Sequence, residues 1–242
     1  MAARRRLPRG ARARAATVVE RLAAQYPKAE CALTHDGPLQ LLVATILSAQ
    51  CTDERVNMVT PELFRRYPDA AAFAAADPAE LEELIRSTGF FHAKARAIIA
   101  MSEEVVTRFG GQVPDRMEDL VTLRGVGRKT ANVVLGVAFG KPGFAVDTHV
   151  TRLAGRLKLT ASTDPVEIEA DVCSVVPASE WTALGLRLIH HGRQVCVARG
   201  PRCPVCVLND ICPSAQITGL RPSRGNRARA GAPASRGGAA RR

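Results

Sequence analysis

The segment from residue 123 to residue 150 constrains the fold more than any other part of this chain of 242 residues. It opens with two glycines one residue apart, Gly125 and Gly127, which permit backbone conformations and close approaches that a side chain forbids. The apolar stripe that follows at helical spacing consists of Val126, Val133, Val134, Val137 and Ala138. A helix therefore follows the turn directly, and the free N–H groups at its start attract an anion such as a phosphate.

Two chemically active side chains flank this helix. Lys129 lies in its first turn, and Asp147 follows eighteen residues later, directly before a second helical pattern at 148–157. A phosphate-binding turn, a primary amine and a nearby carboxylate together suggest chemistry on a nucleic-acid backbone. The residues also have plainer interpretations, because most surface lysines are solvated charges and Asp147 is suited to cap the next helix. From the residues alone both interpretations stay open.

The rest of the chain predicts an all-helical protein. Aromatic residues make up only 4% of it, alanine is abundant and strand-like alternation is nearly absent. Caps, early prolines and apolar periodicity predict helices at 12–25, 38–47, 54–66, from 69, from 78, and at 93–109, 115–122, 148–157, 165–175 and 180–191. Trp181, His190 and His191 are interpreted as structural.

The formal net charge of +11 is concentrated at the two ends of the chain. Residues 1–14 contain six arginines and residues 217–242 contain seven, with no acidic residue in either stretch. Removing these 13 from the 34 basic residues leaves 21 against 23 acidic residues, a net charge of −2 for residues 15–216. Such tails are expected to be disordered and to attract polyanions without sequence preference, although a role in solubility alone stays open.

Four of the seven cysteines fall within 17 residues of each other, with the spacing C-x6-C-x2-C-x5-C. They are Cys196, Cys203, Cys206 and Cys212. No apolar run approaches the ~20 residues that span a bilayer, and the N-terminus is not a secretory signal, so a cytosolic location is expected and disulfides are disfavoured. Spacing alone leaves a structural zinc site and a [4Fe–4S] cluster about equally favoured. The other cysteines, Cys31, Cys51 and Cys173, are expected to be packed thiols.

Several motifs resemble the endonuclease III family of DNA glycosylases, in that family's order and over roughly residues 30–216. LRGVGRKTANVVL resembles its helix-hairpin-helix, and VDTHV resembles the segment that carries its aspartate. LLVATILSAQCTDERVN resembles its LSAQ–TD helix junction, and the four cysteines resemble its iron–sulfur loop. The resemblance implies an all-α fold in which two helical domains flank a DNA-binding cleft. These are a six-helix bundle at 31–141, with the hairpin at 123–135, and an iron–sulfur domain at 15–30 and 142–216.

The resemblance also implies a function in base excision repair. The expected enzyme is a DNA glycosylase with AP lyase activity that removes oxidised pyrimidines through a Schiff base on Lys129 and nicks the strand 3′ of the abasic site by β-elimination. Asp147 is expected to stabilise the positive charge that develops on the sugar. The expected partner is double-stranded DNA with damaged pyrimidines or abasic sites. The protein is expected to be a monomer in the bacterial cytoplasm and to be associated with the nucleoid when it is bound to DNA.

The family's other site residues carry over by position. Gln50 is expected to reach into the DNA stack, and Phe90 to act as an apolar wedge while Phe91 packs in the core. The residues expected to hold the DNA backbone are Gly125, Val126, Gly127 and Arg128. The four clustered cysteines are expected to bind a structural [4Fe–4S] cluster.

Three other kinds of protein share some of these features. Adenine glycosylases of the same superfamily usually lack the lysine and carry an extra C-terminal domain, whereas here Lys129 is present and 30 residues follow Cys212. A non-catalytic helix-hairpin-helix protein with a structural metal needs neither Lys129 nor Asp147. A ferredoxin-type electron carrier leaves most of the helical chain unexplained.

Overall fold

The computed structural model describes residues 6–216. Every regular element in this range is a helix, so the fold is all-α, as the sequence predicts. In the same range, no helix is both long enough and apolar enough to cross a membrane. The arginine-rich ends at residues 1–5 and 217–242, expected to be disordered, lie outside the described residues.

Local capping signals explain where five of the described helices begin. The residue before each of them accepts a hydrogen bond from a backbone N–H of the first turn, a donor that the helix itself leaves unpaired. The capping residues are Thr52, Asp69, Asp77, Asp147 and Asp164. The helices that they begin are α3 (Asp53–Arg66), α4 (Ala70–Ala74), α5 (Pro78–Ile85), α9 (Thr148–Arg156) and α10 (Pro165–Cys173).

The other described helices begin without a side-chain cap. They are α1 (Ala11–Gln25), α2 (Pro38–Leu47), α6 (Phe91–Phe109), α7 (Met117–Leu120), α8 (Arg128–Ala138) and α11 (Trp181–Gln194). Three short 3₁₀ turns complete the order: η1 (Arg86–Thr88), η2 (Ala178–Glu180) and η3 (Cys203–Val205).

Two helices extend beyond the sequence-based expectation by two or three residues, whereas α7 is two residues shorter than expected at each end and α10 ends at Cys173 rather than at residue 175. Helix α6 begins at Phe91 rather than at residue 93, because Phe90 adopts a left-handed conformation and its carbonyl accepts the N–H of Lys94. Helix α11 continues to Gln194 rather than to residue 191, since the carbonyl of His191 still accepts the N–H of the residue that follows the helix. Neither extension was marked by a local cap or breaker.

The N-terminal tail is shorter than expected. Residues 12–14 fall both in the basic tail expected at 1–14 and in the helix expected at 12–25, and it is the helix that forms: residues 11–14 are the first turn of α1. The Arg14 guanidinium donates to the carbonyl oxygens of Leu157 and Lys158, over 2.7 and 2.9 Å. These bonds join α1 to the end of α9 and explain why the stretch is ordered.

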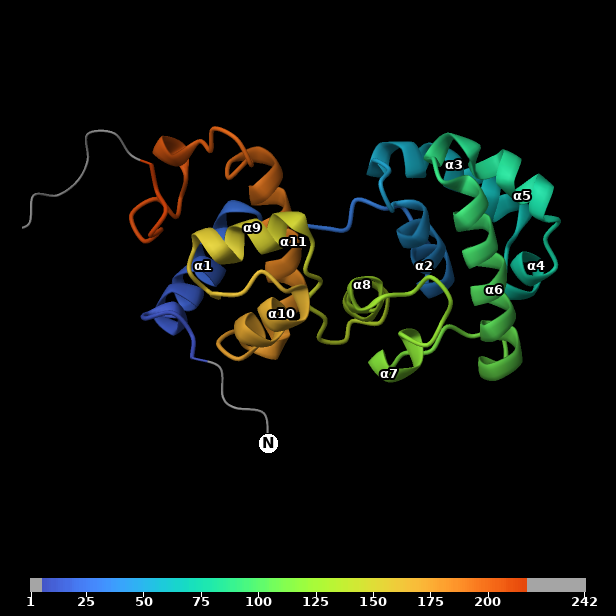
Figure 1. Cartoon of the computed structure of the whole chain (residues 1–242), viewed down its shortest axis with the longest axis horizontal. Helices are drawn as coiled ribbons and strands as arrows, with labels where there is room; N and C mark the ends of the chain where they lie inside the picture. Colours follow the sequence, from blue (N-terminus) through green and yellow to red (C-terminus); the bar gives the residue numbers. More distant parts are fainter. Residues whose placement is uncertain (1–5, 217–242) are drawn as a thin grey trace, which may run out of the picture.

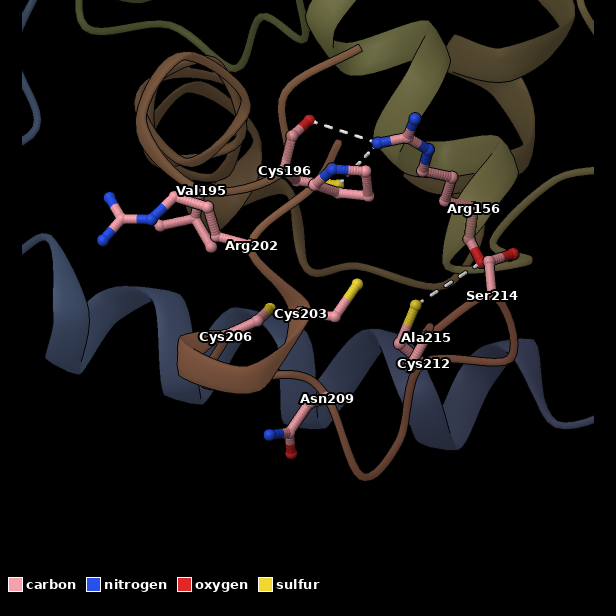
Figure 2. A pocket seen from close by; sticks show the side chains of 11 residues that line it. Arg156, Val195, Cys196, Arg202, Cys203, Cys206, Asn209, Cys212, Ser214 and Ala215 are labelled. Carbon is pink, nitrogen blue, oxygen red and sulfur yellow. Dashed lines mark hydrogen bonds between the residues drawn. The ribbon is translucent and has the colours of Figure 1, made fainter. Parts of the chain in front are cut away.

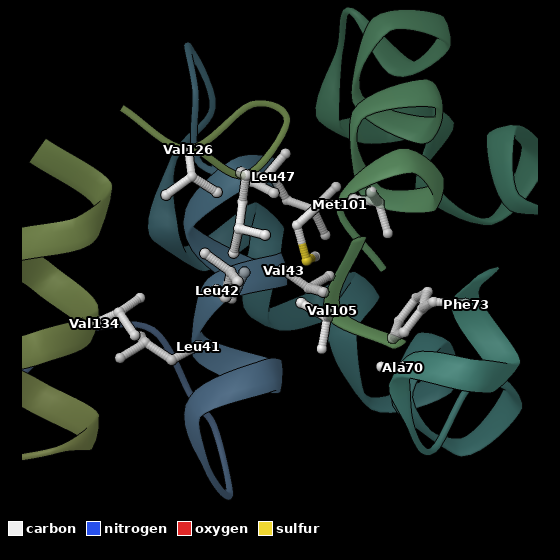
Figure 3. Close-up of a cluster of buried hydrophobic side chains, with 14 of the residues drawn as sticks. Leu41, Leu42, Val43, Leu47, Ala70, Phe73, Met101, Val105, Val126 and Val134 are labelled. Carbon is white, nitrogen blue, oxygen red and sulfur yellow. The ribbon is translucent and has the colours of Figure 1, made fainter. Parts of the chain in front are cut away.

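Two hydrophobic cores organise the helices into two domains (Figure 1). The first core is built from residues 33–135, and Figure 3 shows its centre, where α2 and α6 pack together with Phe73. The second core combines residues 15–22 of α1 with residues 144–208, which include α9, α10 and α11. The fold is therefore two helical domains; the boundaries at 30/31 and 141/142 stay a prediction.

Helix α8 lies where the two groups of helices meet (Figure 1). It contacts α2 of the first domain and α11 of the second. Its fully covered residues include Ala131 and Leu135 in addition to Val134, whereas Val133 and Val137 of the expected stripe are only half-buried. The stripe is displaced because the helix is covered from two sides, and the start of α8 is thereby held between the domains.

Candidate active site and DNA-binding surface

The turn before α8 presents unpaired backbone donors to solvent. Gly125 has a φ of 77°, in the left-handed region, and a Cβ there would lie 3.0 Å from the Ala97 Cβ, so glycine is required by the fold. Gly127 has an ordinary φ of −89°, and a Cβ there would meet nothing within 4 Å. Among the described residues, the N–H groups of Gly127 and Arg128 have no acceptor. The turn therefore has the form of an anion-binding site at a helix start.

Lys129 and Asp147 line one cleft of about 500 Å³. The lysine extends from the first turn of α8 and is exposed, while the aspartate stands directly before α9. The remaining lining residues come from both domains and are Ser48, Cys51, Asp53, Val146, Thr148, His149, Thr151, Pro165 and Arg193. The structure thus brings together the amine and the carboxylate that the sequence singled out.

Asp147 also caps a helix, as its position directly before α9 suggests. Its Oδ1 accepts the N–H of Val150 over 2.8 Å, which caps α9. A carboxylate has two oxygens and several acceptor positions, so one hydrogen bond to the helix leaves capacity for the cleft. The cap fixes the orientation of Asp147, and the structural and chemical interpretations are compatible.

Asn132, which the sequence pattern does not single out, joins the lysine-bearing helix to the aspartate-bearing segment. Its Oδ1 accepts the N–H of Phe144 over 3.2 Å, and its Nδ2 donates to Glu169 of α10 over 3.0 Å. A Cβ at Gly143 would lie 2.4 Å from the backbone oxygen of Asn132, so the two segments are in direct backbone contact. Asn132 is buried, and a buried amide needs hydrogen-bond partners, but the sequence carries no signal of this burial.

Arg128 makes an ion pair within the protein. Its Nε and Nη2 each donate to Glu169 over 2.8 Å, which joins α8 to α10. The hydrogen bond to Glu169 raises the pKa of Arg128, so the guanidinium is a permanent cation beside the turn. The side chain is engaged in this structure, and its contact with DNA stays a prediction.

A smaller pocket of about 110 Å³ opens beside the cleft and shares Lys129 and Asp147 with it. Its other walls include Cys31, Leu33, Ala145, Val133 and Ile189, with Glu30 and His190 adding polar groups. Arg193 of α11 donates to Asp53 of α3 over 2.8 Å at the border of both cavities. The pocket is therefore a partly apolar chamber between the two domains, next to the candidate reactive groups.

Gln50 and Phe90 line a separate hollow of about 360 Å³ together with Gly125 of the turn. Both have positive φ, 53° and 49°, which costs a residue with a side chain about 1–3 kcal/mol and is typical of functional sites. Phe90 is 66% exposed, whereas Phe91 is half-buried against the first core. The structure thus gathers the residues expected to contact the DNA stack around one concave surface.

The four clustered cysteines surround one small cavity of about 30 Å³ (Figure 2). In the described part of the chain, no three His, Cys, Asp or Glu side chains converge closely enough to hold a single metal ion. The Arg156 guanidinium donates to the Cys196 Sγ over 3.2 Å, and His191 Nε2 lies 3.3 Å from the Cys206 Sγ. Burial lowers the pKa of His191 to about 4 and raises the pKa of the Cys206 and Cys212 thiols. Burial therefore disfavours free thiolates here, and a metal held by these residues would stabilise them.

Comparisons with known proteins agree with this geometry. The family model described as HhH-GPD superfamily base excision DNA repair protein matches residues 43–178, more than half of the chain. A solved thermostable thymine-DNA glycosylase superposes with a TM-score of 0.76 at 20% identity, covering 85% of this chain and 98% of that chain, which concerns the fold alone. The fold and the site together define a base excision DNA repair protein with a helix-hairpin-helix.

Two curated relatives are more specific. Endonuclease III of Synechocystis sp. is 57% identical over 194 residues, 80% of this chain and 89% of the relative, and endonuclease III of Bacillus subtilis is 43% identical over 199 residues, 82% and 91%. A structure described as a trapped endonuclease III–DNA covalent intermediate superposes with a TM-score of 0.80 at 40% identity, covering 84% of this chain and 96% of that chain. The chain therefore belongs to the endonuclease III family of DNA glycosylases.

Proposed function

We propose that this glycosylase removes oxidised pyrimidines from double-stranded DNA with Lys129 as the nucleophile, and then cuts the strand at the abasic site. The observation that carries the proposal is that Lys129 and Asp147 line the same cleft, beside a turn with two free N–H groups. An adenine-type glycosylase and a non-catalytic DNA-binding protein have no need of a lysine at this place. The position of Lys129 beside Asp147 in the cleft therefore argues against both of these alternative functions.

The proposed reaction is covalent catalysis by an amine. The neutral amine of Lys129 attacks C1′ of the damaged nucleotide, and the bond from C1′ to the base breaks with its electron pair leaving on the base. The sugar ring opens at its oxygen to give a protonated Schiff base, while Asp147 stabilises the positive charge on the sugar. Loss of a proton from C2′ and departure of the 3′ phosphate cut the strand, and water then releases the lysine.

The damaged nucleotide must first leave the stack, because C1′ is shielded within the duplex. In the proposed complex Phe90 enters the duplex as an apolar wedge, and Gln50 occupies the gap that the extruded nucleotide leaves. The 66% exposure of Phe90 and the hollow that it shares with Gln50 support these roles. The 110 Å³ pocket that contains Lys129 and Asp147 is the place proposed for the extruded base.

The proposed grip on the DNA backbone is tested by Gly127→Ala. The added Cβ meets no protein atom within 4 Å, so the free energy of unfolding is expected to fall by no more than about 1 kcal/mol, the cost of placing alanine at the N-cap of α8. It does occupy the space through which a phosphate reaches the free N–H groups. Losing one hydrogen bond to a charged group is expected to weaken DNA binding about tenfold. Fluorescence anisotropy with a labelled duplex measures the change.

Gly155→Ala is the matched control for this substitution, because it too has open space for a Cβ and no positive φ, and it lies in α9. It is expected to leave DNA affinity unchanged. Equal affinities of the Gly127→Ala variant and the wild type would contradict the proposed phosphate site.

We further propose that Cys196, Cys203, Cys206 and Cys212 hold a [4Fe–4S] cluster. A zinc ion needs all its thiolates about 2.3 Å from one point, whereas a cluster takes one thiolate at each of four iron corners. Four thiols spread around one cavity, without any tight group of three, fit the wider arrangement. Such a cluster supplies structural bonds that fix the loop beneath Arg156, and no step of the proposed reaction uses it.

Metal analysis of the purified protein tests the cluster. Iron and inorganic sulfide are expected in equal amounts, about four of each per chain as the cluster formula requires. Cys206→Ser is expected to lower both and to reduce the yield of soluble protein, because the loop loses one of its four anchors to the cluster. Cys173→Ser, which changes a half-buried cysteine outside the loop, is the control. One zinc per chain and no sulfide would contradict the assignment.

The lesion class is tested with duplexes that each carry one defined modification. Oxidised pyrimidines and abasic sites are expected to be cleaved, and adenine opposite an oxidised guanine is expected to remain intact. The reverse preference would favour an adenine-type glycosylase. We also propose that the protein acts as a monomer, which light scattering of the free protein and of its DNA complex measures.

A further inference from the structure

Among the described residues, Lys94 of α6 is the one lysine or arginine that is buried, with 5% of its surface exposed. Lysine is rarely buried to this degree, because removing an ammonium from water is costly unless it is hydrogen-bonded. Its Nζ donates to the carbonyl oxygens of Leu47, over 2.7 Å, and of Thr88, over 2.9 Å. Burial lowers the pKa of Lys94, because removal from water disfavours the charged amine.

The two acceptors are the last residues of two different elements. Leu47 ends α2 and Thr88 ends η1, so each offers a carbonyl that its own helix leaves unpaired. A cation at these positions satisfies both carbonyls and interacts favourably with the negative end of α2. Lys94 is therefore a bridge between the ends of two elements from different parts of the chain.

Each of these ends leads directly into a strained residue. Gln50 follows Leu47 by three positions and Phe90 follows Thr88 by two, and both have positive φ. Left-handed residues with side chains cost about 1–3 kcal/mol each and persist where surrounding contacts hold them. The backbone N–H of Lys94 also donates to the carbonyl of Phe90 over 3.1 Å. One residue thus holds both strained turns, with bonds to three backbone carbonyls.

We propose that Lys94 is a positioning residue that sets the separation of the Gln50 and Phe90 turns, so that both side chains enter the duplex at the same base step. The inference rests on the roles proposed above for Gln50 and Phe90. The three residues line the same 360 Å³ hollow, with Lys94 on its inner wall and most of its surface covered. Two of the three ammonium protons of Lys94 are donated to backbone carbonyls, so its contribution is to fix the relative position of the two turns.

Lys94→Met tests this proposal, because methionine keeps most of the side-chain volume and removes the donors. The informative comparison is between an oxidised pyrimidine in a duplex, which must be unstacked, and an abasic site in single-stranded DNA, which offers no stack to open. Activity on the duplex is expected to fall about 10- to 100-fold in kcat/KM, the scale of a small misplacement of positioning groups. Activity on the single-stranded abasic site is expected to stay within about threefold of wild type. Equal losses on both substrates would indicate a general structural defect and overturn the proposal.

Two further variants keep the test decisive. Lys94→Gln retains a donor group and serves if the methionine variant does not fold; it is expected to show the same selective loss, to a smaller degree. In the background of Phe90→Ala, Lys94→Met is expected to have little further effect, because residues that act as a unit are non-additive. Additive losses would overturn the inference.

The single variants separate this inference from the proposed wedge. If Phe90→Ala alone left activity on the duplex substrate unchanged, the proposed wedge role of Phe90 would be wrong. If Phe90→Ala lowered activity on the duplex selectively and Lys94→Met did not, the wedge role would stand and the positioning role of Lys94 would be wrong.

Discussion

Replacing Lys129 by alanine is expected to abolish base release and strand cleavage together, by at least about 10³-fold, while DNA affinity stays within about threefold of wild type. The amine is the only group of residue 129 that the proposed reaction uses, and no other lysine lines the cleft. Lys129 is exposed at the start of α8, and its side chain makes no hydrogen bond or ion pair with another described residue, so its removal leaves the fold intact. Product analysis on denaturing gels, with and without alkaline treatment, separates base release from cleavage.

Two control variants sharpen this prediction. Lys129→Arg keeps the positive charge but not the nucleophilic amine, and it is expected to be as inactive as the alanine variant. Lys28→Ala removes an exposed lysine that lines neither the cleft nor the hollow, and it is expected to be fully active. Wild-type cleavage of an abasic site by Lys129→Ala would show that the nucleophile has been misassigned.

Asp147→Asn is expected to lower both activities about 10²- to 10³-fold without lowering the melting temperature. Asparagine caps a helix as well as aspartate does, so the bond to the Val150 N–H is retained. The negative charge that stabilises the sugar cation is lost, and the removal of one such stabilising group from an active site costs about this much. Single-turnover rates and a thermal melt measure the two effects separately.

A second substitution at Asp147, and a control at another helix cap, separate the capping role of Asp147 from its charge. Asp147→Ala removes the cap as well as the charge and is expected to reduce the free energy of unfolding by about 1 kcal/mol more than Asp147→Asn does. Asp164 caps α10 in the same way, through the N–H of Glu167, and lies outside the cleft. Asp164→Asn should therefore change neither stability nor rate. Full activity of Asp147→Asn would reduce Asp147 to a helix cap.

The starts of the capped helices were predictable because their signals are local. Asp77 before Pro78 and Asp164 before Pro165 each place a cap, a fixed φ and an acidic third residue within four positions, and both helices begin there. The pairing of Lys129 with Asp147 followed from the resemblance to a family, and the residues alone had left it open. Spacing along the chain says little about which residues meet across a domain boundary.

What the sequence did not reveal depends on contacts between distant segments. Asn132 and Lys94 each look like ordinary polar positions of a helix, and each has a partner far along the chain: Phe144 lies 12 positions from Asn132, and Leu47 lies 47 positions from Lys94. The left-handed conformations of Gln50 and Phe90 run against the preferences of those residues and are imposed by the surrounding structure. The early start of α6 has the same origin. These positions are the ones that hold the candidate site together.

Borohydride reduction during turnover tests the central claim most directly. With a duplex that carries one oxidised pyrimidine, reduction is expected to trap a covalent adduct between the protein and the DNA, and peptide mapping is expected to find the modified deoxyribose on Lys129. The same reaction without borohydride is expected to give the cut DNA strand and no adduct. Absence of any adduct while the base is released, or attachment through another residue, would contradict the account.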